Sequence, residues 1–452
     1  MKKLFAIMLS AALALSLAAC GSATSTVSST PAASAAPENI TLKMSFNGDF
    51  TTMADAVVGA AERVSARYAT EGKNTTVKVE VDYQTIDNSE FSNNIIFAHK
   101  SGDAPDLYLA GTDLNAYVAA NCILDMTDAI VPDALVPGVV VPATVDGKVY
   151  ALPFDLPLRV MYYNENCLRT IGFTEDDITA LPKKIADGSF MLEDFMALCE
   201  EVVKKGASTY GLAHRPSAGN DFYDLLNAMG GEYYDENGKL MFDEAGILRF
   251  FEQIYKNARD TKITPENLNQ MGFDTINKMV GTGEAFAYFG PMFSATYVAK
   301  AAGLDNETFA KQERFVLFPK SANSEKAFCT AAPQFVAISS DTKYPEICKD
   351  IFRELQTGSA DLMAHHSATT FSLSSVLAAN GMSEITESPI LAPVTYMQDY
   401  TKTLPSIKNS TALRALIFDQ IVSLELGQTT PDKAIADVKA QAELNIDGLI
   451  MK

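Results

Sequence analysis

Tryptophan is absent from this chain of 452 residues, and histidine occurs only four times. Imidazole and thiolate groups are the usual ligands of zinc and related metals, so few histidines and no closely spaced cysteines argue against such a site. The one histidine pair, His365 and His366, consists of neighbours, which face different directions on most elements. The composition therefore predicts neither a metal nor a cofactor.

Cysteine is also sparse and scattered. Beside Cys20, which follows an apolar N-terminal run, the chain contains Cys122, Cys167, Cys199, Cys329 and Cys348. An odd, widely spaced set in a large domain is not a disulfide framework. Cys199 and Cys348 lie on the apolar stripes of helical patterns, which predicts small core residues and leaves a single disulfide open.

Basic residues are fewer than acidic ones. The chain has 36 Lys and Arg and 56 Asp and Glu, which gives a formal net charge of −20 at pH 7. Such a chain repels nucleic acid and anionic lipid headgroups, so neither is expected as a direct partner. Past the N-terminal run, no apolar stretch approaches the roughly 18 residues of a membrane-spanning helix. About 410 residues remain beyond the N-terminal region, enough for two lobes with their own cores.

The N-terminal region has the composition of an export signal. Lys2 and Lys3 precede an apolar run that ends at Ala19, and residues 1–19 are the expected signal peptide. The letters LAAC at 17–20 resemble a bacterial lipobox, in which the cysteine is lipidated and becomes the new N-terminus. The alternative is an ordinary cleavage site with a chance cysteine beside it.

The segment after Cys20 favours lipidation. Gly21–Pro37 consists almost entirely of Ser, Thr, Ala and Pro, a composition that forms no core and behaves as a flexible tether. A tether is expected between a lipid and a folded domain. We therefore expect a lipidated Cys20 and a tether over 20–37, which hold an exported domain on the outer face of the cell membrane.

Strand and helix patterns alternate in the first part of the folded region. Expected strands at 40–46, 77–83 and 104–110 are each followed by a helical pattern. Helices dominate the middle of the chain, and a strand at 334–340 with a helix at 345–358 then repeats the opening type of unit. This order predicts α/β lobes on mostly parallel sheets, and the late unit suggests that the chain returns to its first lobe.

Five segments together carry a family resemblance. In chain order they are APDLYLAGTDLNAYVAANCILDMTD (104–128), YALPFDLPLRVMYYNENCLRTIG (150–172), GEAFAYFGPMFSA (283–295), APQFVAISSDTKYPEICKDIF (332–352) and GQTTPDKAIADVKAQAELNID (427–447). Together they resemble the extracellular solute-binding proteins of ABC importers, in the sugar-binding group that includes the maltose-binding type. The resemblance covers nearly the whole chain after the tether.

The resemblance implies a periplasmic-binding-protein-like fold, in which two α/β lobes are joined by a three-segment hinge around a ligand cleft. Lobe 1 is then expected to comprise residues 38–151 and 333–366, and lobe 2 residues 158–328 and 372–452. The implied crossings between the lobes are Leu152–Pro157, Cys329–Pro333 and His365–Phe371. The prolines in the first two suit stiff, extended connections.

The resemblance also implies the function of a non-enzymatic receptor. It would bind a small molecule, expected to be an oligosaccharide, and deliver it as a monomer to an ABC permease with a cytoplasmic ATPase. A peptide or polyamine ligand remains an alternative within the same fold. A secreted hydrolase is the alternative outside it.

A set of binding residues follows from the resemblance. A sugar ring has an apolar C–H face that aromatic side chains cover, and a rim of hydroxyls that Asp, Asn, Arg and backbone groups bind. The expected ligand-binding residues are Phe46, Asn47, Gly111, Thr112, Asp113, Asp155, Arg159, Asn220, Phe222, Met292 and Phe293. The turn with Asp113 and the position after Gly-Pro match contacts of the family, and the other residues lie at a strand end, at the first crossing or where a loop enters a lobe 2 helix.

Several of these residues also have a structural interpretation. Asp113 and Asn220 each precede a helical pattern and could serve as caps. Arg159 could bind a hydroxyl or only pair with Asp155 across the hinge.

The missing tryptophan bears directly on the aromatic contact. The family usually has a ligand-stacking Trp directly after Gly-Pro, where this chain has Met292 followed by Phe293. Phe293 is then either the stacking platform or an ordinary core residue. The pocket is expected to rely on Phe and Tyr.

Hydrolase motifs are scarce. The sequence contains no G-x-S-x-G and no H-E-x-x-H. SDTK at 340–343 matches S-x-x-K by spelling, but it precedes Tyr344-Pro345, which favours a turn, and no K-T-G follows. A carboxylate pair for glycoside cleavage stays open among the 56 acidic residues.

Overall fold

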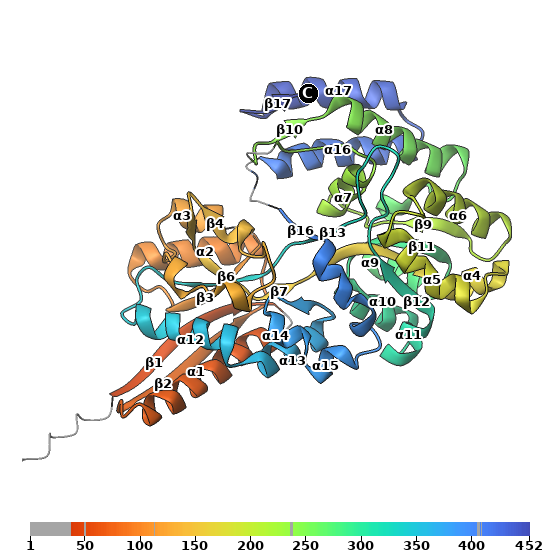
Figure 1. Ribbon diagram of the computed structural model, residues 1–452. Helices are drawn as coiled ribbons and strands as arrows, with labels where there is room; N and C mark the ends of the chain where they lie inside the picture. Colours follow the sequence, from red (N-terminus) through yellow and green to blue (C-terminus); the bar gives the residue numbers. More distant parts are fainter. Residues whose placement is uncertain (1–37, 49–50, 113, 236–237, 405–406, 408) are drawn as a thin grey trace, which may run out of the picture.

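The computed structural model describes residues 38–48, 51–112, 114–235, 238–404, 407 and 409–452. Two lobes, each around its own β-sheet, lie side by side and are joined by crossing segments (Figure 1). The expected signal, Cys20, the tether and Asp113 lie outside the described residues. None of the helices in the described ranges is long and apolar enough to span a membrane.

Lobe 1 is built on a five-stranded sheet. Its strands, in spatial order, are β2 (Thr75–Gln84), β1 (Glu38–Asn47), β3 (Leu107–Gly111), β14 (Phe335–Ile338) and β6 (Ala151–Pro153). Side chains of β1 alternate between buried and exposed until the last residues, Phe46 and Asn47, are both buried. The strand therefore delivers Phe46 and Asn47 to the end of the sheet nearest the other lobe.

Helices cover this sheet. They are α1 (Thr52–Thr70), α2 (Asn88–Ser101), α3 (Asn115–Ala119), α12 (Pro345–Thr357) and α13 (Ala360–Thr370). The apolar face of α1 packs on β2, α12 and α13, so helices from distant parts of the sequence share one layer. Both β14 and α12 belong to lobe 1, which agrees with the expected return of the chain.

Lobe 2 is built on a six-stranded sheet. The order is β16 (Thr401–Thr403), β13 (Cys329–Ala331), β8 (Leu158–Asn164), β11 (Ala285–Pro291) and β9 (Tyr210–Ala213), with β12 (Glu313–Val316) also paired to β8. Every residue of β8 is buried, as expected for a central strand.

The larger number of helices surrounds the second sheet. They are α4 (Glu165–Ile171), α5 (Glu175–Ala186), α6 (Leu192–Lys204), α7 (Asn220–Ala228), α8 (Glu244–Tyr255), α9 (Phe273–Gly281), α10 (Ser294–Ala302), α11 (Asn306–Gln312), α16 (Ser410–Glu425) and α17 (Pro431–Asn445). The close pairs include α9 with α10 and α17 with α8.

Both sheets are mixed, whereas the alternation predicted mostly parallel ones. In lobe 1, β1 is parallel to β2 and β3, but β14 is antiparallel to both β3 and β6. In lobe 2, β8 is antiparallel to β11, β12 and β13. Strands β8 and β14 each arrive directly from the other lobe, without the crossover helix that makes neighbouring strands parallel.

Two crossings lie where they were expected. The first runs from β6 to β8 and includes the short strand β7 (Asp155–Leu156), and the second runs from β13 to β14. Both connect strands of different sheets directly. They therefore define the bottom of the space between the lobes.

The third crossing differs from the expected segment 365–371. That segment forms the end of α13, which packs on α1, and the following strand β15 (Leu373–Ser374) pairs with β7. The chain then passes α14 (Leu377–Asn380) and α15 (Ser383–Thr386), and joins the lobe 2 sheet only at β16. Burial of the apolar side of α13 against α1 holds 360–370 in lobe 1, so this crossing occurs later in the chain.

The five cysteines of the described chain are buried free thiols. Cys199 and Cys348 are core residues, as their helical patterns predicted. No disulfide forms among the described residues.

Candidate functional site

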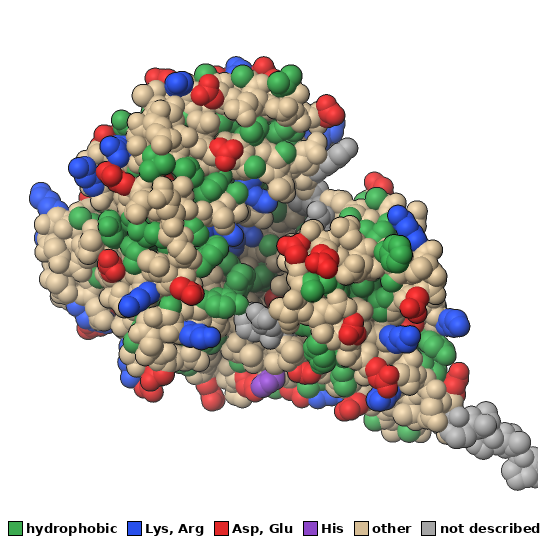
Figure 2. All heavy atoms as spheres, turned by 180° about the vertical axis from the view of Figure 1, so that it is seen from behind, with side chains coloured by type: hydrophobic (Ala, Val, Ile, Leu, Met, Phe, Trp, Pro, Cys, Tyr) green, Lys and Arg blue, Asp and Glu red, His purple; other side chains and the backbone are tan. Residues whose placement is uncertain are grey.

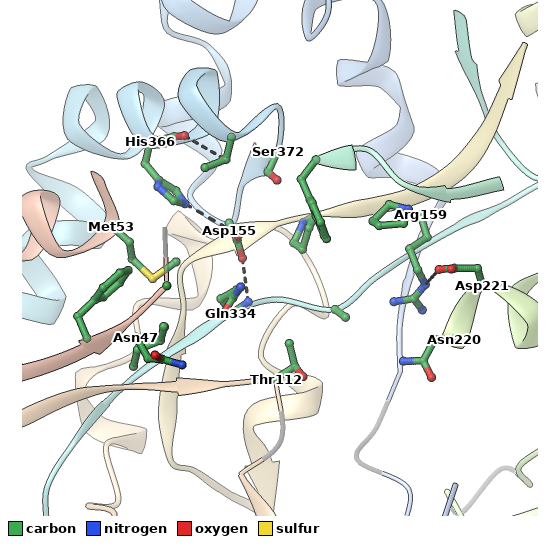
Figure 3. A pocket seen from close by; sticks show the side chains of 18 of the residues that line it. Asn47, Met53, Thr112, Asp155, Arg159, Asn220, Asp221, Gln334, His366 and Ser372 are labelled. Carbon is green, nitrogen blue, oxygen red and sulfur yellow. Dashed lines mark hydrogen bonds and ion pairs between the residues drawn. The ribbon is translucent and has the colours of Figure 1, made fainter. Parts of the chain in front are cut away.

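A cavity of about 310 Å³ lies between the lobes, above the first two crossings. Figure 2 shows the molecule hollowed there, with hydrophobic and basic side chains on the side of the larger lobe. The residues that line it are Phe46, Asn47, Gly48, Met53, Leu109, Thr112, Asp155, Pro157, Arg159, Arg215, Asn220, Asp221, Pro291, Phe293, Ala332, Gln334, His366, Thr370 and Ser372. Both lobes and the hinge contribute to one site (Figure 3).

Asn47 holds the lobe 1 wall in place. Its side-chain amide nitrogen donates to the Ile86 carbonyl at 3.1 Å and to Asn88 Oδ1 at 3.0 Å. Its oxygen accepts from the Ile86 N–H at 2.9 Å. Because these bonds stay within lobe 1, the wall keeps its shape independently of lobe 2.

Two strand ends complete this wall. Phe46 is buried and meets Tyr83 edge-on, with ring centroids 6.0 Å apart. Gly111 has a φ of +69°, a left-handed conformation that favours glycine, and it turns the chain so that Thr112 faces the cavity. Gly111 itself is not among the lining residues, so it shapes the turn.

Asp155 braces the hinge. One of its oxygens accepts from the Gln334 N–H at 2.8 Å, which joins the first crossing to the second. The other lies 3.9 Å from His366 Nε2, and the opposite ring nitrogen of His366 lies 2.9 Å from Thr52 Oγ1. Asp155 therefore links both crossings to α13 and α1.

Arg159 anchors the lobe 2 wall. Its Nε donates to Asp224 Oδ2 at 2.5 Å and lies 3.8 Å from Asp221 Oδ1, while Thr330 donates to the other Asp224 oxygen at 2.9 Å. The partner of Arg159 is thus Asp224 and not Asp155, the pairing that the sequence suggested. All four groups are buried.

Charge and burial compete in this cluster. Burial acts to lower the pKa of Arg159, but the negative charges of Asp224 and Asp221 outweigh it and raise that pKa. Burial raises the pKa of the Asp221 carboxyl, although Arg215 and Arg159 oppose it. The lobe 2 wall is therefore a fixed charge network in a water-poor environment.

Asn220 lies at the start of α7 and lines the cavity. The helix cap is Gly219, which makes no side-chain cap hydrogen bond, so Asn220 does not have the capping role that was the alternative. Its Oδ1 accepts a hydrogen bond from Arg414 of α16.

The three apolar candidates of lobe 2 lie in different environments. Phe293 is half-buried and lines the cavity. Phe222, only 2% exposed, packs in a cluster with His214, Phe289 and Phe418 of the lobe 2 core. Met292 is also fully buried and does not line the cavity.

Sequence reasoning missed several lining residues, among them Met53, Arg215, Gln334, His366 and Ser372. Gln334 follows Pro333 in a crossing that the sequence did predict, so its position carried a usable signal. His366 lies inside the expected third crossing, 365–371, and Ser372 directly follows that segment, so these positions also carried a usable signal.

Two of these missed residues each have a polar side-chain atom that makes no hydrogen bond within the described chain. His366 and Ser372 are each 1% exposed, and neither His366 Nε2 nor Ser372 Oγ makes a hydrogen bond with the described chain. Buried polar groups are nearly always paired. Such atoms in a cavity wall fit a polar ligand. No cluster of metal-ligating side chains occurs in the described part of the chain.

Comparisons with known proteins agree with this architecture. A family model described as bacterial extracellular solute-binding protein matches residues 52–356. The maltodextrin-binding protein MdxE of Bacillus subtilis (strain 168) is 26% identical, and the match covers 97% of each chain.

Solved structures show the same fold. Maltose-bound MalE3 of T. maritima has a TM-score of 0.67 at 16% identity, covering 90% of this chain and 99% of that one. The sugar-binding protein MalE of Xanthomonas citri has a TM-score of 0.69 at 14% identity, covering 89% and 96%. With a family match over most of its length and a two-lobed fold around an interlobe cavity, the chain belongs to the bacterial extracellular solute-binding proteins.

Proposed function

We propose that the protein binds an oligosaccharide between its lobes and delivers it to an ABC permease, as a receptor without catalytic activity. Relatives of the same architecture are named for maltodextrin, for bound maltose and for sugar binding. The cavity supplies the chemistry that such a ligand needs.

The observation that carries this proposal is the pairing of an apolar wall with unsatisfied polar atoms. Phe46, Met53 and Phe293 present apolar surface suited to the C–H face of a sugar ring. His366 Nε2 and Ser372 Oγ make no hydrogen bond in the described chain, although Nε2 lies 3.9 Å from Asp155, and both atoms are suited to the hydroxyls of a sugar. A ligand that fills both roles combines an apolar face with a polar rim.

Hinge closure follows from where these groups lie. Phe46 and Asn47 belong to lobe 1, Phe293 and Asn220 to lobe 2, and Asp155 to the crossing. A ligand that contacts both walls favours the arrangement in which the lobes approach each other. The closed, loaded form is the one presented to the permease.

Membrane attachment is the second part of the proposal. The lipobox-like letters at 17–20 and the Ser/Thr/Ala/Pro segment that follows support a lipidated Cys20 with a tether. Lipidation with more than one acyl chain anchors a protein stably, whereas a single chain does not. The protein would act as a tethered monomer outside the cell.

A thermal-shift panel of neutral oligosaccharides, amino acids, peptides and polyamines tests the ligand class. A true ligand raises Tm with concentration, and we expect an oligosaccharide to give the largest shift. Phe293→Ala should abolish most of that shift. Phe97→Ala is the matched control, because Phe97 is 72% exposed on α2 and does not line the cavity. A peptide or polyamine as the strongest ligand would reject the sugar proposal and leave the fold intact.

Three further measurements address hinge closure, lipid anchoring and the non-enzymatic role. Small-angle scattering should show a smaller radius of gyration with the ligand than without it, and tight binding with no change would reject hinge closure. Cys20→Ala should move the protein from the membrane fraction to the soluble fraction. Unchanged membrane retention would reject the lipid anchor. Recovery of cleaved sugar after incubation would reject the non-enzymatic role.

A further inference from the structure

A second cavity of about 190 Å³ adjoins the first, between β13, the start of α16 and lobe 1. Thr112, Arg159, Asn220 and Ala332 line both cavities, so the two spaces meet. Arg414 and the first residues of α16 line the second cavity but not the first. Its walls include neither Phe46 nor Phe293.

Arg414 differs from the other arginines of the cleft. Arg159 is paired with Asp224, and Arg215 with Asp221. Arg414 donates only to the neutral oxygens of Asn220 and Thr411, and its Nε is buried without a partner in the described chain. No carboxylate among the described residues pairs with its guanidinium.

The pKa values of these arginines show the same contrast. Burial, followed by repulsion from Arg215 and Arg159, lowers the pKa of Arg414 despite opposing contributions from Tyr223 and Tyr233. The pKa of Arg159 is raised, because its carboxylate partners outweigh burial. Arg414 is half-buried, so its guanidinium is partly desolvated without a carboxylate partner in the described chain, and an anion beside it would offset that cost.

The start of α16 adds to the positive potential. This helix has 16 residues, no side chain caps its N-terminus, and Ser410 and Thr411 of its first turn line the second cavity. The first turn of a helix carries partial positive charge and free N–H groups suited to anions. Arg414 lies one turn further along the same helix. Two hydroxyls, a helix N-terminus and a guanidinium that has no carboxylate partner in the described chain thus surround one space.

We propose that this second cavity binds an anionic substituent of the sugar, so that the ligand is an acidic oligosaccharide carrying a carboxylate, sulfate or phosphate group. The sugar rings occupy the first cavity, between Phe46 and Phe293, and the charged group lies against Arg414 and the first turn of α16. This inference rests on the proposed function, because it names the class of sugar that the same cleft accepts.

Isothermal titration calorimetry with matched pairs tests it. The probes are α-1,4-galactobiose and digalacturonate, cellobiose and cellobiouronate, maltose and maltose 6′-phosphate, and lactose and lactose 6′-sulfate. In at least one pair the anionic member should bind roughly tenfold or more tightly, because a hydrogen bond to a charged group contributes that much. The pair that shows the preference identifies the anion. Added salt should weaken the anionic member more than the neutral one.

Arg414→Gln should reduce the preference for the anionic member roughly tenfold or more, and Arg414→Lys should restore part of it. Arg414→Lys also keeps the test valid if the glutamine variant folds poorly. Lys311→Gln is the control, because it removes one positive charge from an exposed site on α11 of the same lobe. The control should leave the preference unchanged.

Two results would overturn the inference, and they differ from failure of the proposed function. Equal or tighter binding of the neutral member in every pair would reject the anion site while sugar binding stands. An unchanged preference in Arg414→Gln would reject the role of Arg414. If no sugar of either kind binds but a peptide or polyamine does, the proposed function fails and this inference fails with it.

Discussion

The two walls of the cleft are built differently. The lining residues that come from β1, α1 and the turn after β3, including Phe46, Asn47, Met53 and Thr112, have uncharged side chains. The lobe 2 wall contains Arg159, Arg215 and Asp221, with Asp224 directly behind. One wall is an apolar and amide surface, and the other is a buried ionic network.

This difference affects what each wall can do. Asn47 is held by bonds to the segment that follows β2, so the lobe 1 wall is preorganised by neutral hydrogen bonds. Arg159 is held by ion pairs to buried carboxylates. Burying these charges costs free energy, and their mutual attraction offsets that cost only while every partner is present. Substitutions in the lobe 1 wall should therefore be able to change ligand affinity with little loss of stability, whereas substitutions in the lobe 2 wall should change both together.

The largest expected effect comes from breaking the ionic network. Arg159→Ala leaves Asp224 buried without its partner, and the free energy of unfolding should fall by about 3–5 kcal/mol. Urea unfolding followed by circular dichroism measures this, since the chain has no tryptophan to report by fluorescence. Ligand affinity should fall as well.

The control for that variant replaces both charges. The double substitution Arg159→Met and Asp224→Leu removes the unpaired carboxylate, so it should be markedly more stable than Arg159→Ala. A single variant that loses less than about 1 kcal/mol would show that the network does not couple stability to the wall.

The second prediction compares a core phenylalanine of lobe 2 with one that lines the cavity. Phe222→Ala should cost about 3–5 kcal/mol of stability, because it opens a void in the aromatic cluster with His214 and Phe289. Phe293→Ala should cost less stability, because Phe293 is half-buried, but should weaken sugar binding roughly ten- to hundredfold. Calorimetric titration and urea unfolding of both variants test this. The opposite pattern would place the binding platform at Phe222.

These two phenylalanines show how far sequence reasoning reaches. Both were expected binding residues: Phe293 because it directly follows the position of the family's stacking Trp, and Phe222 because it lies where a loop enters a lobe 2 helix. Which of them faces the cavity depends on how α7 and the turn after β11 pack against the lobe 2 core. A motif locates a segment, whereas the direction of one side chain depends on tertiary packing.

Local patterns determined other features well. The alternation of β1 delivers Phe46 and Asn47 to the cleft, and the two proline-rich crossings lie where the sequence indicated. The partner of Arg159 could not be inferred, because Asp224 lies 65 residues away on α7. The third crossing was misplaced because 365–371 has no proline or glycine to distinguish it from the end of a helix that packs on α1.

A smaller effect is expected from the lobe 1 wall. Asn47→Ala removes bonds to both backbone groups of Ile86 and one to Asn88, which should cost about 1–3 kcal/mol. Sugar affinity should fall because the loop that follows β2 is no longer fixed beside the cavity. Urea unfolding and calorimetric titration measure the two losses. An unaltered affinity would show that lobe 1 preorganisation does not contribute to binding.

The smallest effect concerns pH, and it should distinguish the walls once more. Behind the lobe 2 wall, His214 Nε2 lies 2.6 Å from Glu425 Oε1, and its other ring nitrogen lies 2.7 Å from the Arg215 carbonyl. Burial acts to lower the pKa of His214, but the charge of Glu425 and these hydrogen bonds outweigh it and raise that pKa above 6.5.

A raised histidine pKa stabilises the folded state through the protonated ring. This contribution is complete below the unfolded-state value near 6.5 and is lost as pH rises through the higher folded-state pKa. The reference is the double variant His214→Gln and Glu425→Gln, which lacks both titrating groups. The unfolding free energy of the unmodified protein minus that of this variant should fall as pH rises from about 6.5 through the higher folded-state pKa. Asn47→Ala, measured across the same range, should differ from the unmodified protein by a constant amount, because its lost bonds are neutral. A constant difference for the His214 variant as well would show that the lobe 2 wall is no more sensitive to pH than the wall opposite.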